Sequence, residues 1–226
     1  MKEMLIPLLM DNHFEAMIHS LPNNTLEIYE IAVKAESEPF TPIYIWNGFN
    51  IKEKDLISIV KSHRDIEIST IKMSFENKFA AMAWIYKNLI EKNNLTAERK
   101  KYLIGKRYEL EKASHGASDR FRGNRYKKNI KSDVGLSGHK TRNLIAKSTG
   151  TTESYVRHAY SYSRGLDAAE SVYPGITEDI LFKKIKIPAC KISEIYKVPI
   201  QQRKDFLDDL LAKTQNQKMC LKRCDK

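Results

Sequence analysis

Residues 139–159 of the chain read HKTRNLIAKSTGTTESYVRHA, and this stretch predicts two helices joined by a tight turn. Gly150 can take the positive φ that such a turn needs, and either Thr151 or Thr152 can cap the second helix. Ala146 is small where the two helices would cross most closely. The predicted core of this helix-turn-helix consists of Ile145, Ala146, Gly150 and Val156, together with Ala159. An ordinary helical hairpin is the alternative, because the Ala-x-x-x-Gly spacing is common by chance.

Basic residues are concentrated in the middle of this 226-residue chain, which has 39 Lys and Arg against 28 Asp and Glu and a net charge of +11. Residues 93–165 carry 17 basic and 6 acidic side chains, an excess equal to that of the whole protein. Residues 1–92 are by contrast slightly acidic. Such a block is the expected footprint of contacts to nucleic-acid phosphates, although basic helices also occur where they serve only solubility.

The second helix of the motif supplies the candidate base-reading residues. Its first turns would enter the major groove, where Arg157 is the best candidate to read a guanine. His158 is equally well explained as a solvated surface imidazole. The predicted base-reading residues are Thr152, Glu153, Ser154, Arg157 and His158.

Basic side chains in and before the motif are more naturally contacts to phosphate, which position a protein on DNA without specifying sequence. The predicted phosphate contacts are Arg120, Arg122, Arg125, Lys127, Lys128, Lys140, Arg142 and Lys147.

The first 92 residues predict a small mixed domain, so the expected fold class of the chain is α+β. The β-branched and aromatic run over 43–46 predicts a strand that ends in the turn Asn47-Gly48. Ser74 is expected to cap a helix over 75–91. The other expected elements of this domain are a strand over 14–18, helices over 26–34 and 55–63, and a β-rich stretch over 66–73.

Residues 93–212 predict a mostly helical domain that contains the helix-turn-helix at about 140–162. Thr96 is expected to cap a helix over 97–113, and the polar, glycine-bearing segment 113–138 is interpreted as a basic loop. The remaining expected elements are a short helix over 178–182 capped by Thr177, helices over 189–196 and 199–211, and a polar, frayed tail over 213–226.

Five segments spread over most of the chain carry a family resemblance. They are PIYIWNG (42–48), AWIYKN (83–88), NNLTAERKKYLIGKRYELEK (93–112), the 146–156 motif and ILFKKIKI (180–187), of which 93–112 is the most specific. Their order resembles the ParB-like proteins of phages and mobile elements, and the resemblance covers most of residues 14–200. It implies a ParB N-terminal-like domain followed by the helix-turn-helix. It also implies a DNA-binding role in plasmid partition or in the transcription regulation of a mobile element.

One motif usual in that family is absent. After the turn Asn47-Gly48, family members usually carry an Asp-Gly-His-x-Arg type motif of the nucleotide-binding and nuclease pocket, whereas this chain reads FNIKEKDL over 49–56. Without that glycine and arginine, neither a close backbone approach nor a guanidinium fork would hold a phosphate there. We therefore expect no enzymatic activity, no catalytic residue and no cofactor. A nuclease or CTP-dependent clamp with an altered pocket, and an RNA-binding module, are the alternatives.

Metal sites and membrane spans are not expected either. The six histidines are scattered, and Cys220 and Cys224 have no further ligands nearby. The longest apolar run, 4–10, is far shorter than the roughly 20 residues that cross a bilayer. We therefore expect a cytoplasmic, nucleoid-associated protein with no membrane partner.

The expected partner is double-stranded DNA, which proteins of this kind commonly read as a homodimer at two half-sites. Apolar residues of the last third would either form the dimer contact or complete the core of the monomer. These residues are Leu181, Ile185, Ile195, Phe206 and Leu210.

Overall fold

The computed structural model describes residues 42–51, 69–91, 95–114 and 138–224, and the chain divides into two compact units, residues 1–85 and 86–226. A small three-stranded sheet and seven α-helices confirm the expected α+β fold class for the described residues. The elements expected over 14–18, 26–34 and 55–63 lie outside the described residues. None of the helices described has the length and apolar character needed to span a membrane.

The sheet of the first unit has the strand order β2-β1-β3. β1 (Ile43–Trp46) pairs antiparallel with β2 (Phe49–Asn50) and parallel with β3 (Thr70–Lys72). The turn between β1 and β2 is formed by Asn47 at φ 48° and Gly48 at φ 83°. Two successive positive φ values match the twist of a two-residue hairpin, which is why Asn-Gly is favoured there. The predicted strand and turn are therefore confirmed.

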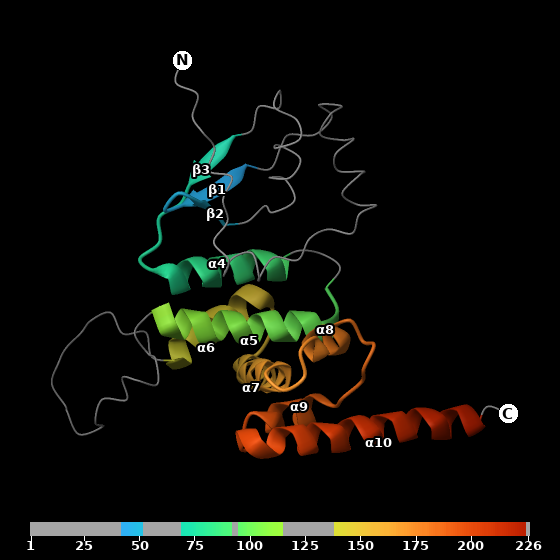
Figure 1. Ribbon diagram of the computed structural model, residues 1–226. Helices are drawn as coiled ribbons and strands as arrows, with labels where there is room; N and C mark the ends of the chain where they lie inside the picture. The colour runs from blue at the N-terminus through green and yellow to red at the C-terminus, as the bar shows by residue number, and fades with distance from the viewer. Residues whose placement is uncertain (1–41, 52–68, 92–94, 115–137, 225–226) are drawn as a thin grey trace, which may run out of the picture. The chain divides into compact units, whose positions relative to one another are not determined.

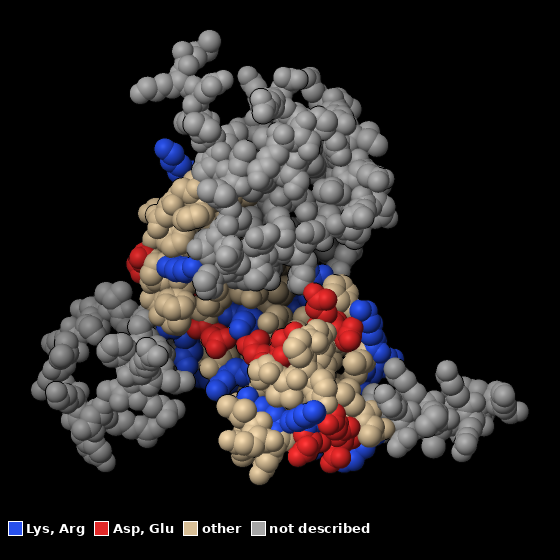
Figure 2. Space-filling view, viewed as in Figure 1, with Lys and Arg blue, Asp and Glu red and all other residues tan. Residues whose placement is uncertain are grey.

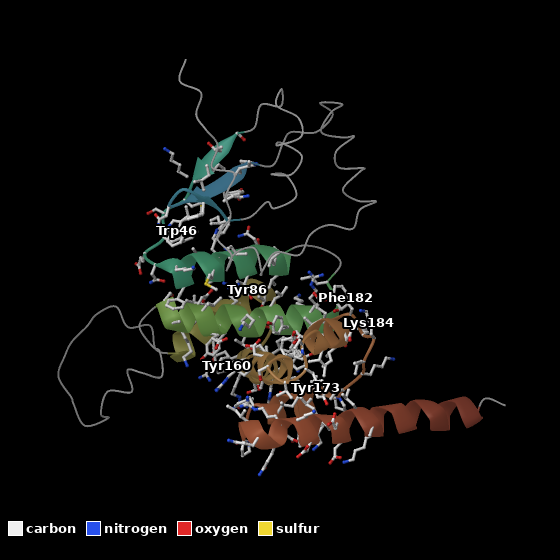
Figure 3. All side chains as sticks on the ribbon, in the orientation of Figure 1. Trp46, Tyr86, Tyr160, Tyr173, Phe182 and Lys184 are labelled. Carbon is white, nitrogen blue, oxygen red and sulfur yellow. The ribbon has the colours of Figure 1, made fainter. Side chains whose placement is uncertain are left out.

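Aromatic side chains pack the sheet against α4 (Lys78–Glu91). The ring of Trp84 on α4 lies 5.2 Å from Tyr44 and 5.8 Å from Phe75. Phe75 in turn lies 6.2 Å from Trp46, which Figure 3 labels. The helix begins later than expected, because Asn77 Oδ1 accepts a hydrogen bond from the backbone N–H of Ala80 at 3.0 Å. The N-cap is Asn77, and the prediction of Ser74 was wrong.

The second unit is helical and is built around α7 (Glu153–Glu170). Figure 1 shows α5 (Ala97–Ser114) beside α7, with α8 (Ile176–Leu181) and α9 (Ala189–Ile195) following it in the chain. α6 (Gly138–Thr149) precedes α7, and a short 3₁₀ turn over Ile200–Gln202 leads into α10 (Arg203–Cys224). The core holds fully buried side chains from α7, α9 and α10: Tyr162, Leu166, Ala169, Ile192, Ile195 and Leu207.

The N-cap of α5 is the one that the sequence predicts. Thr96 Oγ1 accepts from the backbone N–H of Arg99 at 3.1 Å and also donates to the carbonyl oxygen of Leu181 at 3.0 Å. One hydroxyl thus caps α5 and ties its start to the end of α8.

Two expectations for the last third are wrong. Thr177 does not cap α8; Gly175 takes that position at φ 88°, and the Thr177 backbone N–H donates to the Glu170 carboxylate. The helix α10 does not end at residue 211 but continues to Cys224. Its last turns contain no Gly or Pro and are rich in Lys, Gln, Met and Leu, which all favour a helix.

The apolar residues of the last third lie in the core of the helical unit. Leu181 and Ile195 are buried there, and Ile185, Phe206 and Leu210 pack against them. These five side chains therefore complete the core, which was one of the two alternatives open from the sequence.

Candidate nucleic-acid interface

A three-residue turn joins α6 to α7. Gly150 has φ 65°, and the backbone N–H of Thr151 donates to the carbonyl oxygen of Ala146 at 2.9 Å, which ends α6. Thr152 then has extended backbone, and its Oγ1 accepts from the backbone N–H of Tyr155 at 3.1 Å. Of the two cap candidates, Thr152 is the N-cap of α7. Thr151 instead shares a hydroxyl contact of 2.9 Å with Thr149.

Buried side chains and one polar contact fix the angle between α6 and α7. Ile145, Val156 and Ala159 have no exposed surface, and Ala146 is 5% exposed. Across the turn, Asn143 Nδ2 donates to Glu153 Oε1 at 2.9 Å. The start of α7 is therefore held to the middle of α6 by packing and by a hydrogen bond.

The helix α5 supports both helices of this motif. Arg107 is buried; its Nη1 donates to Ser148 Oγ on α6 at 2.9 Å, and its Nε donates to Glu111 at 2.7 Å. A Cβ at Gly105 would lie 2.2 Å from the carbonyl oxygen of Ala159, so α5 and α7 touch backbone to backbone. This close approach exists because Gly105 has no side chain.

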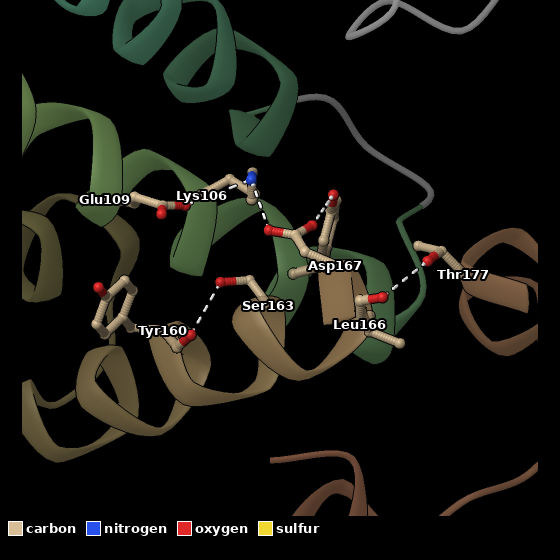
Figure 4. A network of polar contacts seen from close by, with 8 residues as sticks. Lys106, Glu109, Tyr160, Ser163, Leu166, Asp167 and Thr177 are labelled. Carbon is tan, nitrogen blue, oxygen red and sulfur yellow. Dashed lines mark hydrogen bonds and ion pairs between the residues drawn. The ribbon is translucent and has the colours of Figure 1, made fainter. Parts of the chain in front are cut away.

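A polar network ties α5 to α7 further along (Figure 4). Asp167 accepts from Lys106 Nζ at 2.8 Å and from Tyr102 OH at 3.1 Å, and Lys106 also lies 3.3 Å from Glu109. Burial alone would lower the pKa of Lys106, but the carboxylates of Asp167 and Glu109 outweigh it and raise that pKa above its usual value. Burial raises the pKa of nearby Tyr86 to about 12, against the opposing charge of Lys106. Lys106 is therefore a structural cation.

The predicted base-reading residues divide into two groups. Ser154, Arg157 and His158 are exposed and lie at positions i, i+3 and i+4, hence on one face of the first turns of α7. Thr152 is also exposed, but it and Glu153 act within the chain, as the N-cap and as the acceptor for Asn143. Ser154, Arg157 and His158 are therefore the part of the prediction most available to a partner.

The predicted phosphate contacts are less uniform than the sequence indicates. Lys147 is exposed on α6, while Arg142 is half-buried. Burial raises the pKa of Tyr108 above its usual value, against the opposing charge of Arg142. Lys140 lies in the first turn of α6. The five basic residues of the loop lie outside the described residues: Arg120, Arg122, Arg125, Lys127 and Lys128.

Much of the positive charge in the described part of the helical unit is neutralised within the chain. Besides Lys106 and Arg107, ion pairs join Lys183 to Glu98, Lys184 to Asp179 and Lys191 to Glu194. In the view of Figure 2, acidic and basic side chains accordingly lie interspersed over this unit. Net charge alone therefore overstates the surface that is available to phosphates.

Sequence reasoning missed two glycines that set the helix spacing. Gly165 on α7 would place a Cβ 1.9 Å from the carbonyl oxygen of Ile192 on α9, which mirrors the contact of Gly105 with α7. The sequence signal for these close approaches was a glycine inside each helical pattern. Glycine there costs about 1 kcal/mol of stability relative to alanine, so its presence indicates a packing requirement.

Comparisons with known proteins bear on the fold. No family model matches the chain, and no curated protein matches it. Among solved structures, the chain is similar to the C2221 form of a Pnob8-like ParB-N domain, with a TM-score of 0.51 and 17% sequence identity. The similarity covers 85% of this chain and 77% of that chain. The chain therefore has a ParB-like fold, as the resemblance in its sequence implies.

Proposed function

We propose that the chain binds double-stranded DNA in a sequence-specific manner through α6 and α7, as a ParB-like partition or transcriptional regulatory protein. The first turns of α7 enter the major groove, where helix side chains meet base edges. The similarity to a ParB-N domain supports this proposal at the level of the fold.

One observation carries the proposal. Ser154, Arg157 and His158 form an exposed row at the start of an 18-residue helix whose direction is fixed by α5 and α6. Two tight supports hold that helix: the approach of Gly105 to Ala159, and the hydrogen bond from Asn143 to Glu153. A rigid helix that presents polar side chains at its N-terminal end is what direct readout of bases requires.

Each residue has a distinct role in this proposal. Arg157 forms a bidentate pair with a guanine, and Ser154 and His158 contact neighbouring base edges. Thr152 and Glu153 position the helix. Lys147, together with Lys140, Arg142 and the basic loop residues, contacts phosphates on either side.

The test compares Arg157→Ala with the wild-type chain on a preferred duplex, selected from a random pool, and on a scrambled duplex. The variant is expected to lose about 1–3 kcal/mol on the preferred duplex and little on the scrambled one. Lys191→Ala is the matched control, because it also removes an exposed cation of the helical unit but one paired with Glu194. It should bind both duplexes like the wild type.

Two outcomes would contradict the proposal. An unchanged ratio of the two affinities in Arg157→Ala would remove α7 as the reading helix. Stronger binding to RNA than to duplex DNA in competition would replace DNA by RNA as the partner.

A further inference from the structure

A row of alternating cations and aromatic rings crosses the helical unit from α5 over α7 to α9. We call it the cation–aromatic row and define it by Lys112, Tyr160, Arg164, Tyr196 and Lys197. Arg164 Cζ lies 4.5 Å from the ring centroid of Tyr196 and 5.7 Å from that of Tyr160. Lys112 Nζ lies 5.7 Å from the Tyr160 ring, and Lys197 Nζ lies 6.0 Å from the Tyr196 ring. Figure 3 labels Tyr160, the residue that α7 contributes to this row beside Arg164.

The cations of this row differ from Lys106, Arg107 and Lys191 in what they contact, and they share the ring contacts that Arg99 and Lys101 also make. Lys106, Arg107 and Lys191 each have a carboxylate partner. Within the described part of the chain, Lys112, Arg164 and Lys197 have ring contacts and no ion pair to a carboxylate. An aromatic face orients a cation without cancelling its charge, so the row keeps a positive charge available to an anion.

Arg164 is the centre of the row and is exposed. A guanidinium stacked on a ring keeps its N–H donors in its own plane, and that plane matches the two oxygens of a phosphate. Its ring contacts also reduce the side-chain freedom that phosphate binding would otherwise have to remove. Because cations already cover Tyr160 and Tyr196, the row is suited to phosphate groups rather than to stacked bases.

The position of Arg164 on α7 relates the row to the reading face. Ser154, Arg157, Ser161 and Arg164 follow one another at spacings of three or four residues and therefore share one face of the helix. Arg164 lies roughly 10 Å beyond Arg157 along the axis, since an α-helix rises about 1.5 Å per residue. The major groove is about 12 Å wide, so a residue at that distance from the base-reading position reaches the sugar–phosphate backbone.

We propose that the cation–aromatic row is a second DNA contact, a clamp on the phosphate backbone of the duplex that flanks the bases read by α7. This proposal rests on the proposed function. It assigns Arg164 as the main phosphate ligand, Tyr160 and Tyr196 as the residues that orient it, and Lys112 and Lys197 as neighbouring cations.

The experiment measures binding isotherms of the full chain on the preferred and the scrambled duplex at several salt concentrations. Arg164→Gln is expected to bind both duplexes about tenfold more weakly, since charge-assisted hydrogen bonds are among the strong ones. It should also lower the slope of log K against log salt by about 0.9, the value for one lost phosphate contact. Arg164→Lys keeps the charge and should retain the slope, while losing severalfold in affinity because an ammonium offers no planar fork.

Lys191→Gln is the control and should change neither affinity nor slope, because Glu194 already pairs with that lysine. An unchanged slope and affinity in Arg164→Gln, measured beside an Arg157→Ala variant that loses specificity, would overturn the clamp and leave the proposed function intact. A wild-type chain that binds no duplex would instead overturn the proposed function and the clamp with it. A loss in Arg164→Gln on the preferred duplex alone would identify a base contact and also overturn the clamp.

Discussion

Gly105 on α5 lies so close to α7 that a Cβ at this position would be 2.2 Å from the carbonyl oxygen of Ala159. The same Cβ would be 2.6 Å from the Oγ of Ser163. No real Cβ contact is this short, so any side chain here forces two helices apart. Since α7 carries the proposed reading face, this contact controls how firmly that face is held.

Gly105→Ala is expected to destabilise the protein, although helix propensity alone would predict a gain of about 1 kcal/mol. Overpacking against a backbone atom should cost about 2 kcal/mol or more. Urea denaturation measures the net change. The control is Ala97→Gly, at an exposed position in the first turn of the same helix, which should cost no more than about 1 kcal/mol. A stabilised Gly105→Ala variant would show that α5 and α7 are further apart than described.

Asp167→Asn should destabilise the helical unit, because Lys106 and Tyr102 would lose the carboxylate to which both donate. The side chain of Asp167 is 39% exposed, so solvent screening reduces the loss to about 1–2 kcal/mol. Thermal unfolding at neutral pH checks this value. Asp179→Asn, which breaks an exposed pair with Lys184, should change stability by less than about 0.5 kcal/mol. Equal effects of the two substitutions would contradict the structural role of Asp167.

Glu170 should make the stability depend on pH in the acid range. Burial would raise the pKa of Glu170, but its hydrogen bonds from the backbone N–H groups of Gly175 and Thr177 outweigh this and lower it. A lowered pKa in the folded state means that the carboxylate stabilises the fold above its unfolded-state pKa of about 4.3. That contribution is lost as the pH falls through the folded-state pKa.

Glu170→Gln should therefore be less stable than the wild type at pH 7, by up to about 1 kcal/mol after allowance for solvent screening. The difference should shrink as the pH falls below about 4. Denaturant unfolding at a series of pH values measures it. Glu91→Gln, at an exposed position at the end of α4, serves as the control. A stability difference that grows toward acid pH would contradict the assigned sign.

Nucleotide binding is expected to be absent near residues 47–54, because the glycine, histidine and arginine of the family motif are missing there. Without them the segment lacks both a close backbone approach and a fork for phosphate. Calorimetric titration with CTP and with ATP, each with magnesium, checks this. Micromolar affinity for either nucleotide would show that other residues replace the motif.

Local signals account for the parts of the fold that the sequence predicts correctly. The Asn47-Gly48 turn, the Thr96 cap and the turn at Gly150 each depend on the conformational preference of one or two residues, and the structure contains all three. The caps of α4 and α8 were misplaced, because Ser74 and Thr177 carry the same local preference as true caps. At the start of α8, the Glu170 carboxylate accepts hydrogen bonds from the backbone N–H groups of Gly175 and Thr177, and this arrangement replaces a side-chain cap by Thr177.

The α+β class, the turn between α6 and α7, and the exposed positions at the start of α7 follow from local sequence patterns. Long-range contacts in the fold settle whether a cation such as Lys106 or Arg164 is available to a partner. Lys106 lies in the same basic block as Arg164, yet Asp167, 61 residues away, neutralises it, while the ring of Tyr196 flanks Arg164. The reason is that Asp167 and Tyr196 meet their partners only after the chain has folded back on itself, whereas turns and caps form between neighbouring residues.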